Sequence, residues 1–498
     1  MDDLAQRQFE TAAGPVDTID VDTIDVEPVN KREKRSLYAA RPRIHPKRAR
    51  GDFRRLKWLI MLVTLGIYYG TPWIRWDRGP FAPDQAVLID FPASRFYFFF
   101  IEIWPQEFYY VTGLLIIAAM ALFLITSIAG RVWCGYTCPQ TVWTDLMIAI
   151  ERFVEGDRNA RLRLDRAPWD ARKIGLKLTK HSIWLLVGVL TGGAWVFYFA
   201  DAPTLAVQLA IFDAPMTAWL FIGIFAATTY VLGGLAREQV CTYMCPWPRI
   251  QGAMLDEESL VVTYHPDRGE PRLSHKAGES WEDRGHCIDC NQCVAVCPMG
   301  IDIRDGQQLE CIGCALCIDA CNEVMEKVSL PRGLISYDTL GNMERRAKGE
   351  PTKFNIVRPR TIFYAVIIAV VSAIMLYVLA TRPDLEVNVL HDRNPLFVRL
   401  ADGSIRNGFT VKILNKLRAN REVRIGLAGL PSAGLRIIGM PDGASALTVA
   451  PDRLRSIRVF VTVPAVAFNS GNAPVAFTIS DIGGPVTIRR ETVMRGPQ

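Results

Sequence analysis

Residues 287–322 read CIDCNQCVAVCPMGIDIRDGQQLECIGCALCIDACN and contain one cysteine spacing, CxxCxxCxxxC, twice. A chain binds two 4Fe-4S clusters with such a double run: three closely spaced thiolates bind one cluster and the fourth binds the other. The spacing therefore predicts two clusters, each with ligands from both runs. The ligands expected for the first cluster are Cys287, Cys290, Cys293 and Cys321, and those for the second are Cys297, Cys311, Cys314 and Cys317.

A zinc ribbon is the main alternative for so many cysteines, but structural zinc sites use two CxxC pairs and not runs of four. The second run differs from the usual pattern at one position, because Asn322 stands where a proline commonly follows the last cysteine. This difference removes no ligand. We therefore interpret residues 254–350 as a domain of the two-cluster ferredoxin type.

The composition limits what the rest of the chain can be. The 498 residues exceed a single ordinary domain, and 50% of them are hydrophobic. Eight of the twelve cysteines lie in the double run and four in two CxxxC pairs, so none is left for a structural disulfide. The formal charge of +6 is modest and the basic residues are clustered, which favours membrane orientation and argues against nucleic-acid binding.

Residues 1–54 are expected to form a disordered cytoplasmic tail that is acidic at first and then basic. Residues 1–30 hold eight acidic residues and one basic residue, with no apolar core of the kind found in signal peptides. Twelve Lys or Arg follow between Lys31 and Lys57, next to an apolar run. Such clustered positive charge is typical of the cytoplasmic flank of a membrane span.

Five apolar segments are long enough to cross a hydrocarbon core of roughly 30 Å. Four lie within residues 55–253 and the fifth within 360–381, and they cover about 56–76, 106–129, 182–200, 217–236 and 361–380. The stretch 158–180 holds eight Lys or Arg and the stretch 201–216 holds none, which predicts that the N-terminus lies inside. The expected fold class is a five-helix transmembrane bundle with the ferredoxin domain inserted on the cytoplasmic side, where reducing conditions suit thiolates.

Residues 383–498 change to short runs in which apolar and polar residues alternate, such as FTVKILNK at 409–416 and RLRSIRVFVTV at 453–463. This period of two, with turn residues between the runs, indicates an antiparallel β-sandwich. The segment has no cysteine, so it lacks the disulfide that helps to identify antibody domains. We predict an immunoglobulin-like sandwich, and the charge count places it on the periplasmic side.

Two further cysteine pairs lie in WCGYTCPQ (133–140) and CTYMCPWPR (241–249), each directly after an apolar segment. A spacing of four residues places two thiols on one side of a helical turn, ~5–6 Å apart between Cβ atoms. Proline favours the first position of a helix, so Cys138 and Cys245 are expected at helix N-termini, where the helix dipole favours a thiolate.

Thiolates are soft ligands that select Cu(I) over hard cations, and a ferredoxin domain on the same side can supply electrons. The candidate residues for copper binding and reduction are Cys134, Cys138, Cys241 and Cys245. Two other interpretations stay open: the four thiols are buried structural residues, or they form a disulfide or another redox pair. The duplication of the motif favours metal binding.

The chain resembles the cytochrome oxidase accessory protein family called CcoG, also FixG or RdxA, over nearly its whole length. The resemblance depends on WCGYTCPQTVWTD, on CTYMCPWPRIQ, on the double cysteine run, on a fifth apolar segment and on IRNGFTVKILNK in the sandwich. The order of these parts is more specific than any one of them.

The resemblance implies a multi-pass protein of the bacterial inner membrane that assists the assembly of a cbb3-type cytochrome c oxidase. It implies cupric reductase activity, in which Cu(II) is reduced to Cu(I) before delivery, and partnership with a copper-exporting P-type ATPase and copper chaperones. The sandwich would dock the oxidase or form a homodimer. Two alternatives stay open: a quinol-linked membrane ferredoxin, similar to those of periplasmic nitrate and nitrous oxide respiration, and an assembly scaffold whose clusters sense redox state.

Overall fold

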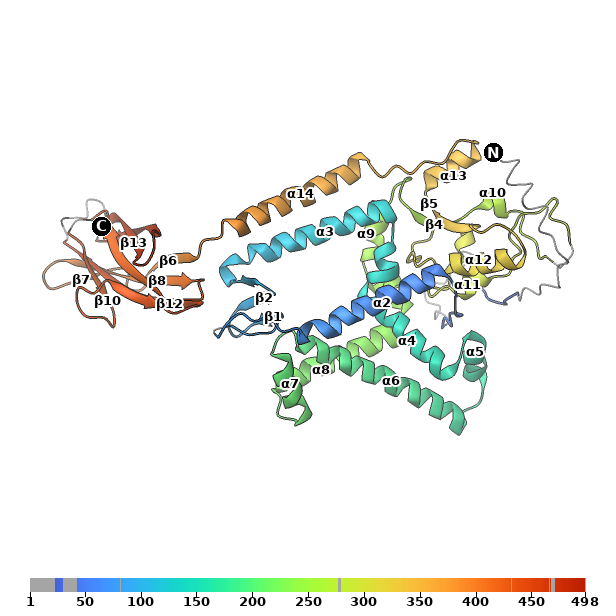
Figure 1. Cartoon of the computed structure of the whole chain (residues 1–498), viewed down its shortest axis with the longest axis horizontal. Coiled ribbons are helices and arrows are strands. Elements are labelled where there is room, and N and C mark those ends of the chain that lie inside the picture. Colours follow the sequence, from blue (N-terminus) through green and yellow to red (C-terminus); the bar gives the residue numbers. More distant parts are fainter. Residues whose placement is uncertain are drawn as a thin grey trace. The chain divides into compact units, whose positions relative to one another are not determined.

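The computed structural model describes residues 23–29, 43–80, 82–275, 279–430, 432–464, 466 and 471–497. The chain divides into two compact units (Figure 1). The first unit runs to Ile74 and from Gln85 to Met375, and it contains all twelve cysteines. The second contains Arg75–Asp84 and Leu376–Gln498. Residues 1–22 and 30–42, over which most of the N-terminal tail was expected, lie outside the described residues.

The first unit is built on long helices. They are α2 (Asp52–Gly70), α3 (Tyr109–Ala129), α6 (Ala171–Val196), α8 (Met216–Thr228, continued by a π-helical segment Thr229–Ala236) and α14 (Pro359–Ala380). Within the described residues, three helical stretches are long and apolar enough to cross a membrane: Pro105–Ala129, Met216–Ala236 and Pro359–Ala380.

The expectation of five spans is therefore wrong for two segments on length and composition. Helices α2 and α6 form where spans were expected, but charged residues occupy their first turns. In α2 the basic residues extend to Lys57 and leave Trp58–Gly70 as the apolar part, and in α6 they extend to Lys180. Both apolar remainders are shorter than the ~20 residues that a span needs. The expected five-helix bundle is reduced, over the described chain, to three helices with the composition of membrane spans.

Helices α3 and α14 lie side by side and run in opposite directions (Figure 1). Met375, near the end of α14, packs over Gly113, near the beginning of α3. At the other end of the pair, Arg358 Nη2 donates a hydrogen bond to the carbonyl of Ser127 at 2.7 Å. The same carbonyl accepts a hydrogen bond from Ser259 Oγ, also at 2.7 Å, so the end of α3 and the beginning of α14 meet at the cysteine-rich part.

Helices α6 and α8 also run antiparallel, and two glycines let them approach closely. A Cβ atom at Gly188 would lie 2.8 Å from the carbonyl oxygen of Ala226, and one at Gly192 would lie 2.6 Å from that of Ile222. Small residues at such contacts are typical of helix pairs in membranes. Since α3 and the segment ending at Ala236 both lead into cysteine pairs, α6 is the helix that returns the chain between them.

Shorter elements connect the long helices. The helices among them are α4 (Pro139–Glu155), α5 (Arg158–Arg166), α7 (Ala202–Ala210) and α9 (Trp247–Met254). The strands β1 (Val87–Asp90), β2 (Arg95–Phe98) and β3 (Ile101–Ile103) form an antiparallel sheet in that order. The aromatic-rich stretch before α3 thus folds as a small sheet, in which Arg95 pairs with Glu102 at 3.0 Å.

The cysteine-rich part of the first unit contains two strands and four helices. They are β4 (Val261–Tyr264), α10 (Pro266–Gly269), α11 (Gln292–Ala295), α12 (Leu316–Lys327), β5 (Ile335–Asp338) and α13 (Leu340–Ala347), with β4 antiparallel to β5. The two cysteine runs fold alike, because the residues before and after the second cysteine have positive φ in both. These angles are 53° at Asp289, 56° at Asn291, 68° at Gly313 and 59° at Ala315. Each run therefore turns at the same point before its ligand-bearing helix begins.

Residues 23–29 and 43–50 lie on this cysteine-rich part, although the sequence predicted a disordered tail over residues 1–54. Three backbone hydrogen bonds hold them there: Ile24 N to Cys290 O (3.1 Å), Val29 N to Gly300 O (2.9 Å) and Lys47 N to Ala295 O (2.8 Å). Backbone pairing of this kind leaves no hydrophobic pattern in the sequence, which explains why the composition pointed to disorder.

The second unit contains an antiparallel β-sandwich. Its strands are β6 (Leu385–His391), β7 (Val398–Arg399), β8 (Ile405–Asn415), β9 (Arg421–Ala428), β10 (Gly434–Ile437), β11 (Ala446–Val449), β12 (Arg453–Val463), β13 (Asn472–Asp481) and β14 (Thr487–Arg495). One sheet has the order β10-β12-β8-β6 with β7 on β8, and the other has the order β11-β9-β13-β14. Inward-facing residues such as Phe409, Val459 and Phe477 are fully buried between the sheets, as the period-two pattern predicts.

Candidate metal centres

The eight cysteines of the double run surround two cavities. The first cavity is lined by the four cysteines expected to hold one cluster, Cys287, Cys290, Cys293 and Cys321. The second is lined by the other four, Cys297, Cys311, Cys314 and Cys317, and is also touched by Cys293. Apolar side chains such as Ile303 and Leu334 complete the walls. Four thiols in an apolar wall are the donor set that a 4Fe-4S cluster requires, so both cavities fit the group.

In the described chain, no three His, Cys, Asp or Glu side chains already converge as a metal-binding group. The backbone N–H group of Gln292 faces the thiol of Cys290, and that of Gly313 faces the thiol of Cys311.

Each cavity has an arginine beside it, nearly buried at the first cavity and half-buried at the second. Arg304, next to the first cavity, pairs with Asp302 at 2.7 Å and lies near Cys293. Arg131 lies near Cys311 of the second cavity and donates to its backbone carbonyl at 3.0 Å. A fixed cation at each site favours the reduced, more negative form of a cluster.

The two CxxxCP pairs also come together, although more than a hundred residues separate them in the chain. The thiol of Cys134 lies within electrostatic range of Cys138, Cys241 and Cys245. Its Sγ donates a hydrogen bond to Gln251 Oε1 at 3.0 Å. The four cysteines therefore gather into one group, which we call the four-thiol site.

Both pairs have the same backbone geometry. Each lies on a single π-helical turn, Trp133–Thr137 and Val240–Met244. In the first motif the N–H of Cys138 bonds to the carbonyl five residues earlier at 2.9 Å, and in the second the N–H of Cys245 does so at 2.8 Å. π-Helical turns are rare and are frequently found at functional sites. The structure thus repeats the motif in three dimensions as well as in the sequence.

The expected helix N-termini are found for one pair. Cys138 is the N-cap residue of α4, with Pro139 at the first position, as predicted. Cys245 does not cap a helix, because α9 begins at Trp247 after Pro246. The first cysteine of each pair is the more deeply placed: burial raises the pKa of both Cys134 and Cys241 to about 12. A metal that binds there has to displace the thiol protons.

The first pair packs directly on the loop that carries the second cluster cavity. Gly135 allows this contact, because a Cβ atom there would lie 2.9 Å from the carbonyl oxygen of Gly313 and 3.0 Å from the Cα of Cys314. The hydroxyl of Tyr136 donates to the carbonyl of Cys314 at 3.3 Å. Cys134 and Cys314 belong to one buried apolar cluster. The four-thiol site is therefore next to the second cavity.

Arg131 fixes this arrangement. Its guanidinium donates to the carbonyls of Leu309 and Cys311 on the ligand loop, and to the carbonyl of Pro248 behind the second cysteine pair at 2.8 Å. One side chain thus joins the end of α3, the ligand loop and the second motif. No sequence pattern predicts this role, because the partners are about 120 and 180 residues away.

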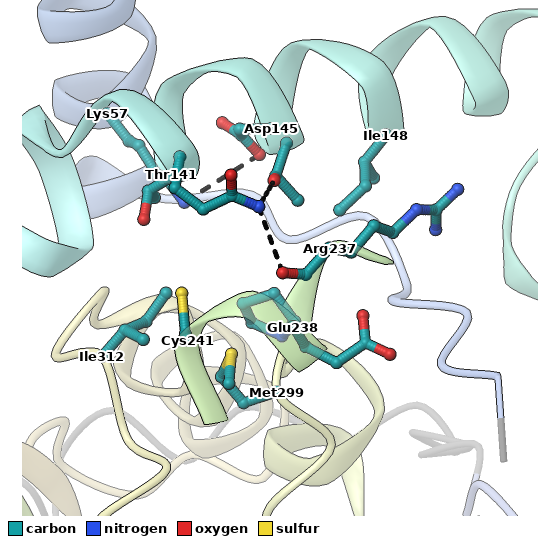
Figure 2. A pocket seen from close by; sticks show the side chains of 12 residues that line it. Lys57, Thr141, Asp145, Ile148, Arg237, Glu238, Cys241, Met299 and Ile312 are labelled. Atoms are coloured by element: carbon teal, nitrogen blue, oxygen red, sulfur yellow. Dashed lines mark hydrogen bonds and ion pairs between the residues drawn. The ribbon is translucent and has the colours of Figure 1, made fainter. Parts of the chain in front are cut away.

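A small pocket opens beside Cys241 (Figure 2). Its walls carry the buried cations Lys57 and Arg237, the carboxylate of Asp145 and the thioether of Met299. Lys57 Nζ lies 3.9 Å from Asp145 Oδ1. The pocket leads to one thiol of the four-thiol site. Residues from α2 and α4 form part of its wall, and no sequence motif predicted them. Met244, unlike the buried Met299, is 62% exposed.

A buried ion cluster supports α4 behind the site. Glu151 is fully buried and pairs with Arg43 at 3.1 Å, Arg161 at 3.0 Å, Lys180 at 3.4 Å and Arg237 at 2.8 Å. Burial alone would raise the pKa of this carboxyl, but the cations, Arg237 foremost, lower it to about 2. The cluster joins the N-terminal segment 43–50, α5, α6 and Arg237, which precedes the second motif.

Comparison with protein families supports this arrangement. Residues 236–340 match the 4Fe-4S dicluster domain family, and residues 111–155 match a 4Fe-4S binding domain family. Residues 375–497 match the family described as the IG-like fold at the C-terminal of FixG. The chain therefore has iron–sulfur domains and an immunoglobulin-like C-terminal domain.

Three relatives match almost end to end. Nitrogen fixation protein FixG of Rhizobium meliloti is 56% identical over 480 residues, which cover 90% of this chain and 92% of FixG. Protein RdxB and Protein RdxA of Cereibacter sphaeroides are 50% and 49% identical and cover 93% and 90% of this chain and 98% and 96% of their own length. The chain thus belongs to the FixG/RdxA family, also called CcoG, and is an iron–sulfur electron-transfer protein of a membrane.

Proposed function

We propose that this protein reduces Cu(II) to Cu(I) at the four-thiol site, for the assembly of a cbb3-type cytochrome c oxidase. The observation that carries the proposal is the direct packing of the first CxxxCP motif on the ligand loop of the second cluster cavity. A thiol site that only stabilised the fold would not need to lie beside an electron carrier. The duplicated π-helical turns favour a shared ligand in the same way.

The lining of the two cavities supports the proposed cluster ligands. Cys287, Cys290, Cys293 and Cys321 would hold the first cluster, and Cys297, Cys311, Cys314 and Cys317 the second. Bound clusters of this kind supply single electrons at low potential, on the order of −400 mV for some types, so reduction of Cu(II) is downhill.

The four thiols have the chemistry for the copper step. On binding copper, Cys134, Cys138, Cys241 and Cys245 would lose their protons, and four thiolates favour the soft Cu(I) product over Cu(II). Each Cu(II) takes up one electron, which a cytoplasmic one-electron donor has supplied. The apolar packing around Cys134 would shield a bound copper ion from water on that side.

The directions of the helices support one membrane arrangement, which we propose here. We place the N-terminus and residues 254–350 in the cytoplasm of the bacterial inner membrane. Helix α3 ends and α14 begins at the cysteine-rich part, so the chain leaves α14 at the opposite end, and residues 383–498 would lie in the periplasm. Exposed leucines on α6, such as Leu185 and Leu186, support contact of that helix with lipid.

The partners come from the family resemblance. A copper-exporting P-type ATPase and copper chaperones would handle the metal before or after its reduction, and the immunoglobulin-like domain would dock the oxidase or form a homodimer. The alternatives are a quinol-linked ferredoxin of a respiratory chain and a redox-sensing scaffold, and in both of them the four-thiol site would be structural.

One observation favours a second role for the four-thiol site. The 4Fe-4S binding domain family matches residues 111–155, yet Cys134 and Cys138 are the only cysteines in that stretch. A cluster there would need Cys241 and Cys245 as its other ligands, and the structure brings these four thiols together. A third cluster is therefore the competing occupant of the site.

The test compares the purified protein with a variant carrying Ser at all four cysteines. Reduced protein is mixed with Cu(II), Cu(I) is measured with a chelator, and iron and sulfide are counted in both proteins. Loss of copper reduction with unchanged iron supports the copper site, whereas equal reduction by both proteins rejects it. Loss of iron and sulfide together identifies a third cluster. Thr137→Ser with Thr242→Ser, which changes both motifs but keeps their thiols, is the control, and a parallel assay of quinol oxidation tests the respiratory alternative.

A further inference from the structure

A large groove lies on the cysteine-rich part of the first unit, apart from the pocket beside Cys241. Its volume is about 210 Å³, against about 20 Å³ for either cluster cavity. The N-terminal arm 47–50, Asp157 and helix α12 contribute to its walls. No residue of this groove lines the pocket beside Cys241, so the two openings are separate.

The floor of the groove is next to cluster ligands in the chain. Gln292, Val296 and Ala320 line the groove, and each is followed directly by a cysteine of the double run. Those cysteines belong to both proposed clusters. The arm is fixed on this floor, because Lys47 Nζ donates to Gln292 Oε1 at 3.0 Å and its backbone N–H donates to Ala295. An electron carrier seated in the groove would be one residue away from the cluster thiols.

The rim of the groove is cationic. Four basic side chains line it, those of Lys47, Arg48, Arg50 and Lys327, against two carboxylates. The carboxylates have partners nearby: Asp157 accepts from the backbone N–H of Arg48 at 3.1 Å, and Glu323 pairs with Lys327 at 3.1 Å. Clustered charge of one sign raises the encounter rate with a partner of the opposite sign.

The chemistry of the clusters limits what that partner can be. A 4Fe-4S cluster takes up one electron at a time, so a hydride donor such as a nicotinamide nucleotide cannot reduce it directly. The groove has room for the exposed edge of a prosthetic group but not for a whole protein, so the carrier would rest on the cationic rim.

We infer that this groove is the docking site for an acidic one-electron carrier protein of the flavodoxin or small ferredoxin class. The reduced carrier loses one electron and one cluster gains it, with no bond made or broken. The inference rests on the electron-transfer role of the protein and does not need copper to be the acceptor. It assigns electron entry to the groove and electron exit to the four-thiol site.

The test uses the full-length protein in detergent and reduced flavodoxin as the donor, with bleaching of the cluster absorbance followed by stopped flow. Charge reversal by Arg50→Glu with Lys327→Glu is expected to lower the second-order rate constant about tenfold at low salt and to flatten its dependence on ionic strength. Reduced methyl viologen, a small cationic donor, should reduce the variant as fast as the original protein. The matched control is Lys348→Glu with Lys353→Glu, which reverses two exposed charges elsewhere in the same part of the chain.

Two results would overturn the inference: an unchanged rate and salt dependence in the groove variant, or no reduction of the original protein by flavodoxin. Arg50→Gln with Lys327→Gln repeats the test with neutral side chains and should show a smaller effect in the same direction. If flavodoxin reduces the clusters through the groove but Cu(II) is not reduced, the copper proposal fails and the docking site stands. If copper is reduced with viologen alone, the reverse holds.

Discussion

Gly135 is the residue at which the first cysteine pair comes nearest to the ligand loop, so the smallest side chain should already separate them. In Gly135→Ala the new methyl group would meet the carbonyl of Gly313 and the backbone of Cys314. We expect a loss of about 1–3 kcal/mol in stability, as for other overpacked sites, and slower copper reduction at full cluster content. Thermal unfolding and the chelator assay measure the two effects.

Gly175→Ala is the matched control, because no atom lies within 4 Å of a Cβ placed there. In helix α6 this change should leave copper reduction unaffected and raise stability slightly, since alanine favours helices more than glycine does. Equal reduction rates in the Gly135 and Gly175 variants would show that the close contact has no role in electron transfer.

Arg304 should set the potential of the first cluster. Its guanidinium is almost fully buried near Cys293 and stands between this thiol and the carboxylates of Asp302 and Asp289. In Arg304→Gln both carboxylates lose their cation, so the reduced cluster becomes less stable relative to the oxidised cluster. We expect the reduction potential of one cluster to fall by on the order of tens of mV, and the other to move less. A redox titration followed by EPR measures this, with the exposed Arg332→Gln as control; a shift of both clusters by the same amount would contradict it.

At this scale the sequence predicts ligands well and their neighbours poorly. The eight cysteines could be assigned to two groups because their spacing is imposed by the cluster itself. Arg131, Tyr136 and Gln251 carry no such signal, since each acts through contacts to residues far away in the chain. Single contacts of this kind become visible only when the fold is known.

Helix α4 depends on an ion cluster that should make its stability sensitive to acid. In Glu151→Gln, the buried cations Arg161, Lys180 and Arg237 lose the carboxylate that they share. We expect a loss of about 3–5 kcal/mol, because removal of one partner leaves buried charges uncompensated. Chemical unfolding at neutral pH measures it, and the exposed Glu282→Gln should change stability by less than about 0.5 kcal/mol.

The pH dependence of this effect has a definite sign. The pKa of Glu151 is lowered to about 2 in the folded protein from 4.5, its ordinary value. The stabilisation by the carboxylate is therefore fully present above about pH 4.5 and is lost as the pH falls towards 2. The difference in stability between the original protein and Glu151→Gln should shrink over this window. A difference that is constant between pH 5 and pH 3 would mean that Glu151 does not carry it.

The elements show where hydrophobic pattern is a sufficient guide and where it is not. The pattern located α3, α8 and α14 because their apolar runs are unbroken. It overestimated α2 and α6, in which buried charges such as Lys57 and Lys180 extend the helix but not its apolar part. It also gave no hint that Glu151 would lie on the buried side of α4, since the ions that compensate it come from four separate segments.

For the whole molecule, the division into two units predicts that the sandwich folds alone. Residues 383–497 contain both sheets and a closed apolar core. Expressed without the helices, this segment should show β-structure by circular dichroism and a single cooperative unfolding transition. Phe477→Ala should lower its stability by about 3–5 kcal/mol, because the ring is fully buried between the sheets. Unfolding without cooperativity would show that the sandwich needs the first unit.

The tie between α3 and the cysteine-rich part links the redox centres to the lipid around them. The carbonyl of Ser127 accepts hydrogen bonds from Ser259 and Arg358. Arg131, four residues further along the chain, donates a hydrogen bond to the ligand loop. A span responds to a thicker or thinner bilayer by changing its tilt. A change of tilt transmitted in this way would alter the distance between the second cluster cavity and the four-thiol site, on which the proposed electron transfer depends. Lipids of different chain length should therefore alter the rate of electron transfer without touching a single redox group.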